Sequence, residues 1–355
     1  MTAAKTLATT VAMSLIASAP ALADDPCDPG AFVYSSGIYE AELPAGSGLQ
    51  RTFRVHVPES YAPGQPAPLV LVFHGWGGDE NEFLDNPVVI READRRGAIL
   101  VAPRGLGSGA PDMSFNSWSF LGSTEGEDPL GRPICNTRGP DYSYPSCGTP
   151  GQPGSVAQNT CSWTHCQGDD VDFALSLIDF VDEYMCIDTE NVFAAGGSNG
   201  GMYTWTLGQD ARSADRFRAI AALIGLPHRG FVTAKATEDD LPALLITGEQ
   251  DTTVPPGNWE DPGFTSSSGA MNESYYYTSA TAITRSWARA HGCDISTPAE
   301  PFERHRSGYD CRTYCGDDPR VPRVLDCRTS GGHDYDFGSA WPLVMNFFTA
   351  HYLPN

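Results

Sequence analysis

Residues 193–202 read FAAGGSNGGM, so that four glycines surround one serine directly after an apolar run. Glycine loses more backbone entropy on folding than other residues, so this crowding indicates either a steric requirement or a flexible loop. An expected strand precedes the G-x-S-x-G pattern and an expected helix begins near Met202, which favours the steric requirement. The pattern is typical of a sharp strand-to-helix turn that exposes the Ser198 hydroxyl. A plain glycine-rich turn is the alternative.

Short apolar runs along the chain predict buried strands, with helical patterns between them. The runs do not alternate apolar with polar residues, so both of their faces should be covered, as in a parallel sheet. Residues 169–185 have helical spacing, and Asp169 and Asp170 suit the start of that helix, whose carboxylates we expect to face solvent. The alternation predicts an α/β fold with a mainly parallel central sheet flanked by helices. The runs are residues 69–73, 98–102, 192–195, 219–224 and 243–247.

The composition is that of a globular and strongly acidic protein. The 355 residues are 41% hydrophobic and carry a formal net charge of -22. Such a surface repels nucleic acid and anionic membranes, so we expect neither as a partner. The acidity indicates either solubility alone or adaptation to salty or acidic surroundings.

The first 23 residues have the pattern of a secretory signal peptide. Lys5 supplies the positive start, an apolar segment follows from about residue 7 to 19, and Ala21-Leu22-Ala23 forms an A-x-A cleavage site. An uncleaved anchor is the alternative. We expect residues 24–355 to form a single domain that is secreted or periplasmic, and we expect a monomer.

Ten cysteines agree with export, because an even number in an exported chain indicates disulfides. The C-x-x-x-C spacing at 311–315 resembles a metal site, but no matching histidine pair follows it, so we expect no metal. The connectivity stays open. Short separations suggest the pairs Cys135–Cys147 and Cys161–Cys166 as a guess.

Two further residues complete a candidate site with Ser198. A nucleophile on such a turn is followed in the chain by an acid and then by a histidine. Asp251 lies just past the apolar run 243–247, although Glu249 is a rival, and a loop aspartate that only caps a turn is the alternative. His333 follows two glycines that let its loop approach the serine closely, and it is the best candidate base among the eight histidines.

The stretch FHGWGG at residues 73–78 follows the first strong strand, where this kind of fold places backbone donors for an oxyanion. We expect the N–H groups of Trp76 and Asn199 to be those donors. His74 is expected to brace the loop rather than to act as a base.

Residues 105–168 interrupt the rhythm of strands and helices. They are rich in Gly, Pro, Ser and Asp and hold four cysteines, which predicts a disulfide-pinned insertion over one end of the sheet. Its aromatic side chains could form one wall of a cleft, or could only pack the insertion onto the body. The candidates are Trp118, Tyr142, Tyr144 and Trp163, with His165 and His228 as further residues that could line the cleft.

These stretches together resemble secreted α/β-hydrolases of the polyhydroxybutyrate-depolymerase and feruloyl-esterase group, which are also grouped with acetylxylan esterases. The matching stretches are RVHVP at 54–58, HGWGG at 74–78, DDVDF at 169–173, GGSNGGM at 196–202, GEQDTTVP at 248–255 and GGH at 331–333. The resemblance implies an α/β-hydrolase fold and secretion without a cofactor. It also implies that a Ser198–Asp251–His333 triad hydrolyses carboxylic esters.

The chain departs from that group after the histidine. Such enzymes often carry Trp-Pro-Gly there, whereas this sequence continues with Asp334-Tyr335-Asp336. No separate binding domain for solid polyester is visible either, which favours soluble esters such as feruloylated or acetylated plant polysaccharide fragments. The alternatives are a polyester depolymerase, a peptidase on the same fold, and a binding protein without catalysis.

Overall fold

The computed structural model describes most of the chain. The residues described are 25–28, 30–31, 34–44, 49–62, 64–107, 115–136, 144–147, 161, 163–232, 241–260, 263–267, 275–302, 308–315, 318 and 320–353. The expected signal peptide and Tyr142 lie outside them.

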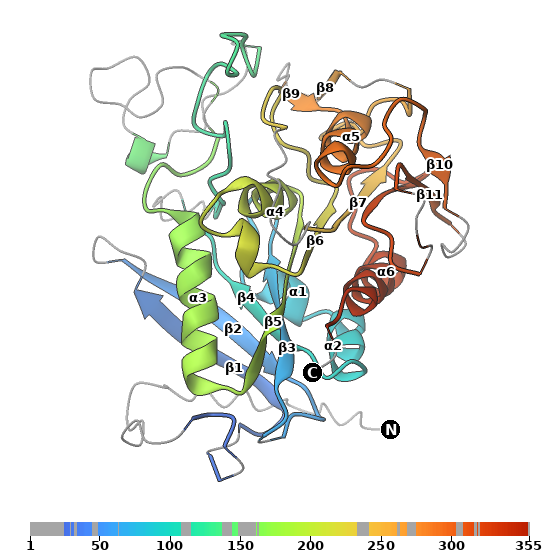
Figure 1. Ribbon diagram of the computed structural model, residues 1–355. Helices are drawn as coiled ribbons and strands as arrows, with labels where there is room; N and C mark the ends of the chain where they lie inside the picture. The colour runs from blue at the N-terminus through green and yellow to red at the C-terminus, as the bar shows by residue number, and fades with distance from the viewer. Residues whose placement is uncertain are drawn as a thin grey trace, which may run out of the picture.

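A ten-stranded sheet with the order β1-β2-β4-β3-β5-β6-β7-β12-β11-β10 forms the centre of the described part (Figure 1). The strands from β4 to β12 in this order run parallel to one another, and antiparallel pairs close both edges. The hairpin β8–β9 is separate. The strands are β1 (Gly37–Pro44), β2 (Gln50–Val57), β3 (Ala67–Phe73), β4 (Ile99–Pro103), β5 (Ile187–Gly197), β6 (Ala219–Leu223), β7 (Ala243–Gly248), β8 (Phe264–Ser266), β9 (Tyr276–Thr278), β10 (Glu300–Pro301), β11 (Asp310–Thr313) and β12 (Val324–Thr329).

Helices cover both faces of this sheet, as the apolar runs predict. Along β3, Leu69 and Leu71 pack on the cluster that contains α3, α4 and α5, whereas Val70 and Val72 pack on the cluster of α1, α2 and α6. All five predicted strands are therefore confirmed. The helices are α1 (Asn81–Leu84), α2 (Pro87–Asp94), α3 (Asp170–Tyr184), α4 (Asn199–Gln209), α5 (Ala280–Ala290) and α6 (Phe337–Ala350), with 3-10 turns at Pro145–Cys147 and Ala214–Arg216.

Helix α3 begins where the sequence predicts, but one carboxylate in its first turn is buried rather than exposed to solvent. Asp169 accepts hydrogen bonds from two backbone N–H groups of the first turn and so caps the helix. Asp170, expected to face solvent, is only 3% exposed and pairs with Arg51 and His165. Burial alone would raise the pKa of Asp170, but the neighbouring His165 and Arg51 lower it below its usual range. The expectation is wrong because the first turn of α3 lies under the insertion.

Five disulfides link all ten cysteines, which confirms the disulfide framework. The guessed local pairs are wrong, because Cys135 pairs with Cys161 and Cys147 with Cys166. Each of these bonds lies in its own apolar cluster, so the packing of the insertion decides the pairing rather than distance along the chain. The others are Cys27–Cys186, Cys293–Cys315 and Cys311–Cys327.

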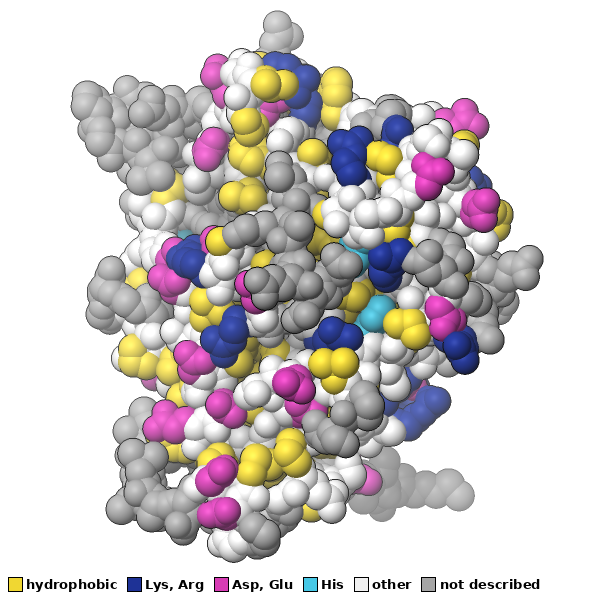
Figure 2. Space-filling model, viewed as in Figure 1, with side chains coloured by type: hydrophobic (Ala, Val, Ile, Leu, Met, Phe, Trp, Pro, Cys, Tyr) yellow, Lys and Arg dark blue, Asp and Glu magenta, His cyan; other side chains and the backbone are white. Residues whose placement is uncertain are grey.

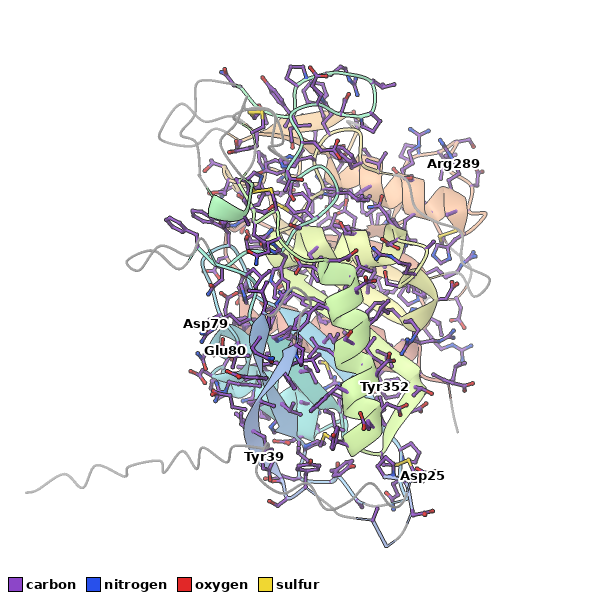
Figure 3. All side chains as sticks on the ribbon, turned by 90° about the vertical axis from the view of Figure 1, so that its left-hand side faces the viewer. Asp25, Tyr39, Asp79, Glu80, Arg289 and Tyr352 are labelled. Atoms are coloured by element: carbon purple, nitrogen blue, oxygen red, sulfur yellow. A yellow bond between two sulfur atoms is a disulfide. The ribbon has the colours of Figure 1, made fainter. Side chains whose placement is uncertain are left out.

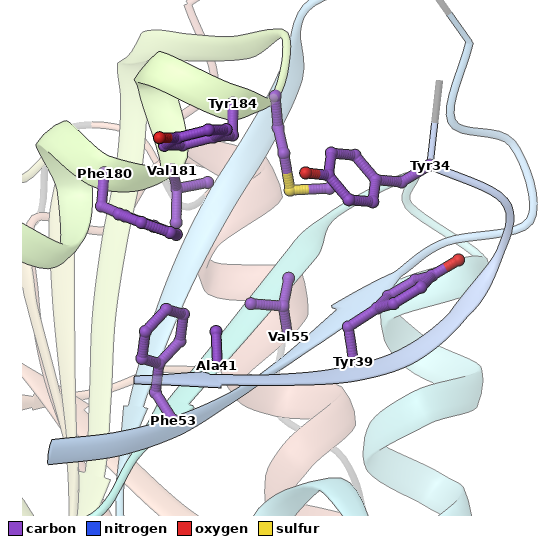
Figure 4. A pocket seen from close by; sticks show the side chains of 9 residues that line it. Tyr34, Tyr39, Ala41, Phe53, Val55, Phe180, Val181 and Tyr184 are labelled. Carbon is purple, nitrogen blue, oxygen red and sulfur yellow. The ribbon is translucent and has the colours of Figure 1, made fainter. Parts of the chain in front are cut away.

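The described parts of the insertion and the β8–β9 hairpin lie above the carboxyl ends of the parallel strands, in the upper part of Figure 1. The two are joined, because the Tyr276 N–H donates to the Ile134 carbonyl at 2.8 Å and Cys135 forms a β-bridge with Tyr275. At the opposite end, α3 packs on β1 and β2 around an apolar pocket of about 30 Å³ (Figure 4). That pocket is too small for a substrate.

Side chains of both charges lie on the surface of the described part of the protein. Acidic side chains are spread over the face drawn in Figure 2, and lysines and arginines lie among them. In the perpendicular view, Asp79 and Glu80 lie on one side of the molecule and Arg289 of α5 on the other (Figure 3). In the described ranges, no helix is both long and apolar enough to cross a membrane.

The disulfides should differ in their contribution to stability according to the loops they close. Cys27–Cys186 joins residues 159 positions apart, and Cys147–Cys166 joins residues 19 apart. On the chain-entropy model, Cys27→Ser/Cys186→Ser should lower the free energy of unfolding by roughly 5 kcal/mol and Cys147→Ser/Cys166→Ser by roughly 3 kcal/mol. Denaturant titrations of both variants measure this, and an equal or reversed order would contradict it.

Candidate active site

Ser198 occupies a strained backbone turn between β5 and α4. Its φ of 52° lies in a region that residues other than glycine rarely adopt. The adjoining glycines are needed because a Cβ at Gly200 would collide with the Phe73 carbonyl oxygen, and a Cβ at Gly196 would collide with Gly200. The Ser198 N–H donates to the Leu223 carbonyl at 2.8 Å, which ties the turn to β6. The steric interpretation of the glycine-rich stretch is therefore confirmed.

The structure brings Ser198, His333 and Asp251 into one hydrogen-bonded chain. The Nε2 atom of His333 lies 2.9 Å from Ser198 Oγ, and its Nδ1 atom lies 2.7 Å from Asp251 Oδ2. Asp251 is 3% exposed, and its other oxygen accepts the N–H groups of Thr253 and Val254 at 2.8 and 2.9 Å. These N–H groups stabilise the carboxylate and fix its direction toward the imidazole.

Parallel pairing of β7 with β12 explains how the acid and the histidine meet. Gly248 pairs with Thr329, so the loops after the two strands begin side by side. The Gln250 N–H then donates to the Gly331 carbonyl at 2.9 Å. A Cβ at Gly248 would collide with the backbone of the histidine loop, so the approach depends on glycine. The rival Glu249 is exposed, whereas Asp251 faces His333.

His74 fixes the loop of residues 74–78, as expected. Its Nε2 atom accepts the Gly105 N–H at 2.8 Å, so the proton is on Nδ1, which donates to the Gly75 carbonyl at 2.6 Å. Burial lowers the pKa of His74 to about 4, so the ring is neutral near pH 7. The same carbonyl accepts the Gly78 N–H at 3.0 Å. Since a peptide is planar and trans, the Trp76 N–H points away from this fixed carbonyl.

The side chain of Asn199 has a role that the sequence does not reveal. Its Oδ1 accepts the Trp118 N–H at 2.7 Å and its Nδ2 donates to the Trp118 carbonyl at 3.0 Å. The residue that follows Ser198 therefore holds the insertion on the turn. Trp118 itself is fully buried, stacks on Tyr203 and donates its indole N–H to the His74 carbonyl. Trp118, a candidate substrate-binding residue in the sequence analysis, therefore does not line a cleft, and for this residue the alternative holds that it packs the insertion onto the body.

A pocket of about 340 Å³ opens beside Ser198 and His333. Trp76 forms one wall, because its indole N–H donates to Tyr144 Oη at 2.7 Å and its ring stacks on Phe115. Among the described residues that line the pocket, only His333 has a side chain that is commonly charged. The lining residues are Trp76, Trp163, Ser198, Met202, Thr253, Val254, Ser267, Tyr275, Tyr277 and His333.

Of the proposed cleft residues in the insertion, Trp163 lines this pocket and His165 does not. His165 is 1% exposed and its Nε2 lies 2.8 Å from Asp170 Oδ2, so it anchors the insertion to α3. His228 is buried behind the pocket wall and its Nε2 accepts the Trp163 indole N–H at 3.0 Å. Sequence reasoning missed the contribution of β8–β9, whose flanking residues Ser267 and Tyr275 carry no recognisable motif.

No metal site accompanies these residues in the described ranges, where no group of three or more His, Cys, Asp or Glu side chains could hold an ion. The cysteine spacing at 311–315 belongs to two separate disulfides.

Comparisons with known proteins agree with this architecture. No family model matches the chain. Over 305 residues it is 27% identical to a protein named "Putative esterase NocK" from Nocardia uniformis subsp. tsuyamanensis, covering 83% of this chain and 72% of that protein. An acetyl xylan esterase from Aspergillus awamori superimposes with a TM-score of 0.51 at 13% identity, covering 88% of this chain and 99% of that chain.

The structural likeness confirms the α/β-hydrolase fold that the sequence predicts. The resemblance to esterases is also supported, because both relatives carry that name.

Because His228 is buried, the free energy of unfolding should depend measurably on pH. Burial lowers its pKa from 6.5 to about 4. The stability gained by keeping it neutral is fully present above pH 6.5 and is lost as the pH falls toward 4, because the unfolded chain takes up the proton first. Between pH 7 and 4.5 this loss should be roughly 2 to 3 kcal/mol.

The variant His228→Gln keeps an acceptor for the Trp163 indole but does not titrate. Its free energy of unfolding should therefore fall less steeply than that of the wild type between pH 7 and 4.5. Urea titrations at both pH values measure the difference. Parallel losses in the two proteins would show that His228 is not held neutral.

Proposed function

We propose that the protein is a secreted serine carboxylic-ester hydrolase that works through an acyl-enzyme, with residues 24–355 as its catalytic domain. The hydrogen-bonded chain from Asp251 through His333 to Ser198, at the mouth of a pocket, carries the proposal. The five disulfides support secretion, because such bonds persist in oxidising compartments.

In this mechanism, His333 takes the proton of Ser198 through Nε2 while the serine oxygen attacks the ester carbonyl. Asp251 holds the imidazole in the tautomer that leaves Nε2 free to accept, and it stabilises the imidazolium that forms. His333 then protonates the departing alcohol. Water hydrolyses the acyl-enzyme in a second step, with His333 again as the base.

The negative charge on the carbonyl oxygen needs donors that are already in place. We assign this role to the N–H groups of Trp76 and Asn199. The hydrogen bonds to the Gly75 carbonyl fix the direction of the Trp76 N–H. The Asn199 N–H belongs to the first residue of α4, where the helix dipole also favours negative charge. Removal of one such donor typically lowers the rate roughly 100- to 1,000-fold.

The pocket supports a neutral ester with an aromatic or small acyl group, of the feruloyl or acetyl type found on plant polysaccharides. Its walls combine indole and phenol rings with the hydroxyls of Thr253 and Ser267. Indole and phenol rings can stack on a phenolic acyl group, while hydroxyls can bond its substituents. An acyl group with a carboxylate would find no lysine or arginine among those lining residues that the structure describes.

Substitutions in the proposed triad should separate chemistry from folding. Ser198→Ala should lower kcat for an aryl ester by more than about 10⁴-fold, and Asp251→Asn by about 10⁴-fold, with little change in thermal stability. Glu249→Gln and Ser176→Ala, both at exposed positions, should keep wild-type kcat. A Ser198→Ala enzyme with substantial turnover would contradict the mechanism.

The two tryptophans of the insertion should respond differently. Trp163→Ala should raise KM for methyl ferulate by about three- to tenfold and leave KM for a short acetyl ester nearly unchanged, because it removes one ring from the pocket. Trp118→Ala should instead lower the free energy of unfolding by about 3 to 5 kcal/mol, since this side chain is fully buried. Equal effects of Trp163→Ala on both esters would exclude aromatic selectivity at that wall.

A further inference from the structure

Tyr335 lies where the histidine loop, the loop of residues 74–78 and the serine turn meet. A Cβ at Gly197 would collide with the Tyr335 ring, and a Cβ at Gly75 would collide with its hydroxyl oxygen. Both glycines therefore leave room for this one side chain. The ring also packs on Phe83 and Phe337, with centroids 6.0 and 5.2 Å away. Tyr335 is the second residue after His333, in the segment where the sequence departs from the group that it resembles.

The hydroxyl of Tyr335 has a specific partner. It lies against Gly75, where it interacts with the carboxylate of Glu82 on α1 as a donor and also with the Gly75 backbone, while Glu82 Oε1 accepts the Gly75 N–H at 3.0 Å. A Cβ at Gly78 would collide with the same carboxylate, so this glycine makes space for Glu82. Burial raises the pKa of Glu82, whereas its hydrogen bonds with Tyr335 and Gly75 oppose that rise.

Gly75 is thus held on both of its backbone polar groups. His74 and Gly78 donate to its carbonyl, and Glu82 accepts its N–H. Two fixed peptide planes leave the next N–H, that of Trp76, with one direction. The Tyr335 hydroxyl is the donor that keeps the Glu82 carboxylate in the position from which it holds Gly75.

We propose that Tyr335 is a positioning residue for ester hydrolysis: through Glu82 it fixes Gly75 and so aims the Trp76 N–H at the oxyanion. This inference rests on the proposed function. The proposal explains why a tyrosine stands two residues after His333. One short segment of the chain then carries His333 and also orients the donor of the oxyanion hole. Loss of the hydroxyl should therefore affect the transition state more than the binding of the neutral substrate.

The test is Tyr335→Phe, which keeps the ring between Gly75 and Gly197 and removes only the hydroxyl. We expect kcat for a neutral aryl ester to fall about 10- to 100-fold, while KM changes less than about twofold. This decrease in kcat should not exceed the decrease caused by removing an oxyanion donor altogether. The matched control is Tyr309→Phe, whose hydroxyl lies 3.1 Å from Ser339 Oγ, and it should keep wild-type kcat.

A double-mutant cycle with Glu82→Gln separates positioning from packing. If Tyr335 acts through Glu82, adding Tyr335→Phe to Glu82→Gln should lower kcat much less than Tyr335→Phe does alone. The proposal is overturned if Tyr335→Phe lowers thermal stability but keeps kcat, or if the two effects on kcat simply multiply. Should the wild type show no ester hydrolysis that Ser198→Ala removes, the proposed function fails rather than the role of Tyr335.

Discussion

The close approach of backbone to backbone around Ser198 is the constraint on which the rest of the structure depends. The serine turn has room only because neighbouring strands and loops present glycine to it, and a Cβ at Gly225 would collide with the Ser198 carbonyl oxygen. The positive φ of Ser198 costs free energy, and so does that of Ile224, which has a φ of 45° next to it. Buried strands on both sides stabilise the strained turn, because it cannot relax without separating β5 from β6.

Around this turn, buried polar side chains form their hydrogen bonds with backbone groups of the protein. The neutral His74 ring and the amide of Asn199 each use both of their hydrogen-bonding ends on backbone groups. Such fully used side chains specify one arrangement, since any shift would leave a buried donor or acceptor without its partner. The pair of Asp170 with Arg51 acts similarly between α3, β2 and the insertion, at the cost of desolvating two charges.

The sequence predicts those parts of the site that depend on local geometry. The glycines around Ser198, the position of Asp251 after a buried strand and the glycines before His333 each report a steric need of their own segment, and the parallel sheet follows from the apolar runs. What it does not predict depends on contacts between distant segments. Trp118 was a candidate cleft residue because the sequence does not show whether an aromatic side chain in a loop faces a pocket or packs against the body of the protein.

The cysteine pairs were mispredicted for the same reason. The true partners are chosen by apolar clusters that draw on residues such as Phe231 and Phe115, far from the cysteines in the chain. The burial of Asp170 depends likewise on Arg51, 119 positions away. A single sequence shows neither contact, because no spacing rule links residues across the fold.

The interleaved disulfides of the insertion have a practical consequence for producing the protein. Cys147 lies inside the loop closed by Cys135–Cys161, whereas its partner Cys166 lies outside, so the two loops overlap along the chain. Expression in a reducing cytoplasm would leave both open. The sheet and the loops that carry Ser198, Asp251 and His333 do not include these cysteines, but the wall around Trp163 does depend on them. A reducing cytoplasm would also leave Cys27–Cys186 and the other two bonds open, so such material would lose stability together with the support of the Trp163 wall, and the protein should be produced in an oxidising host.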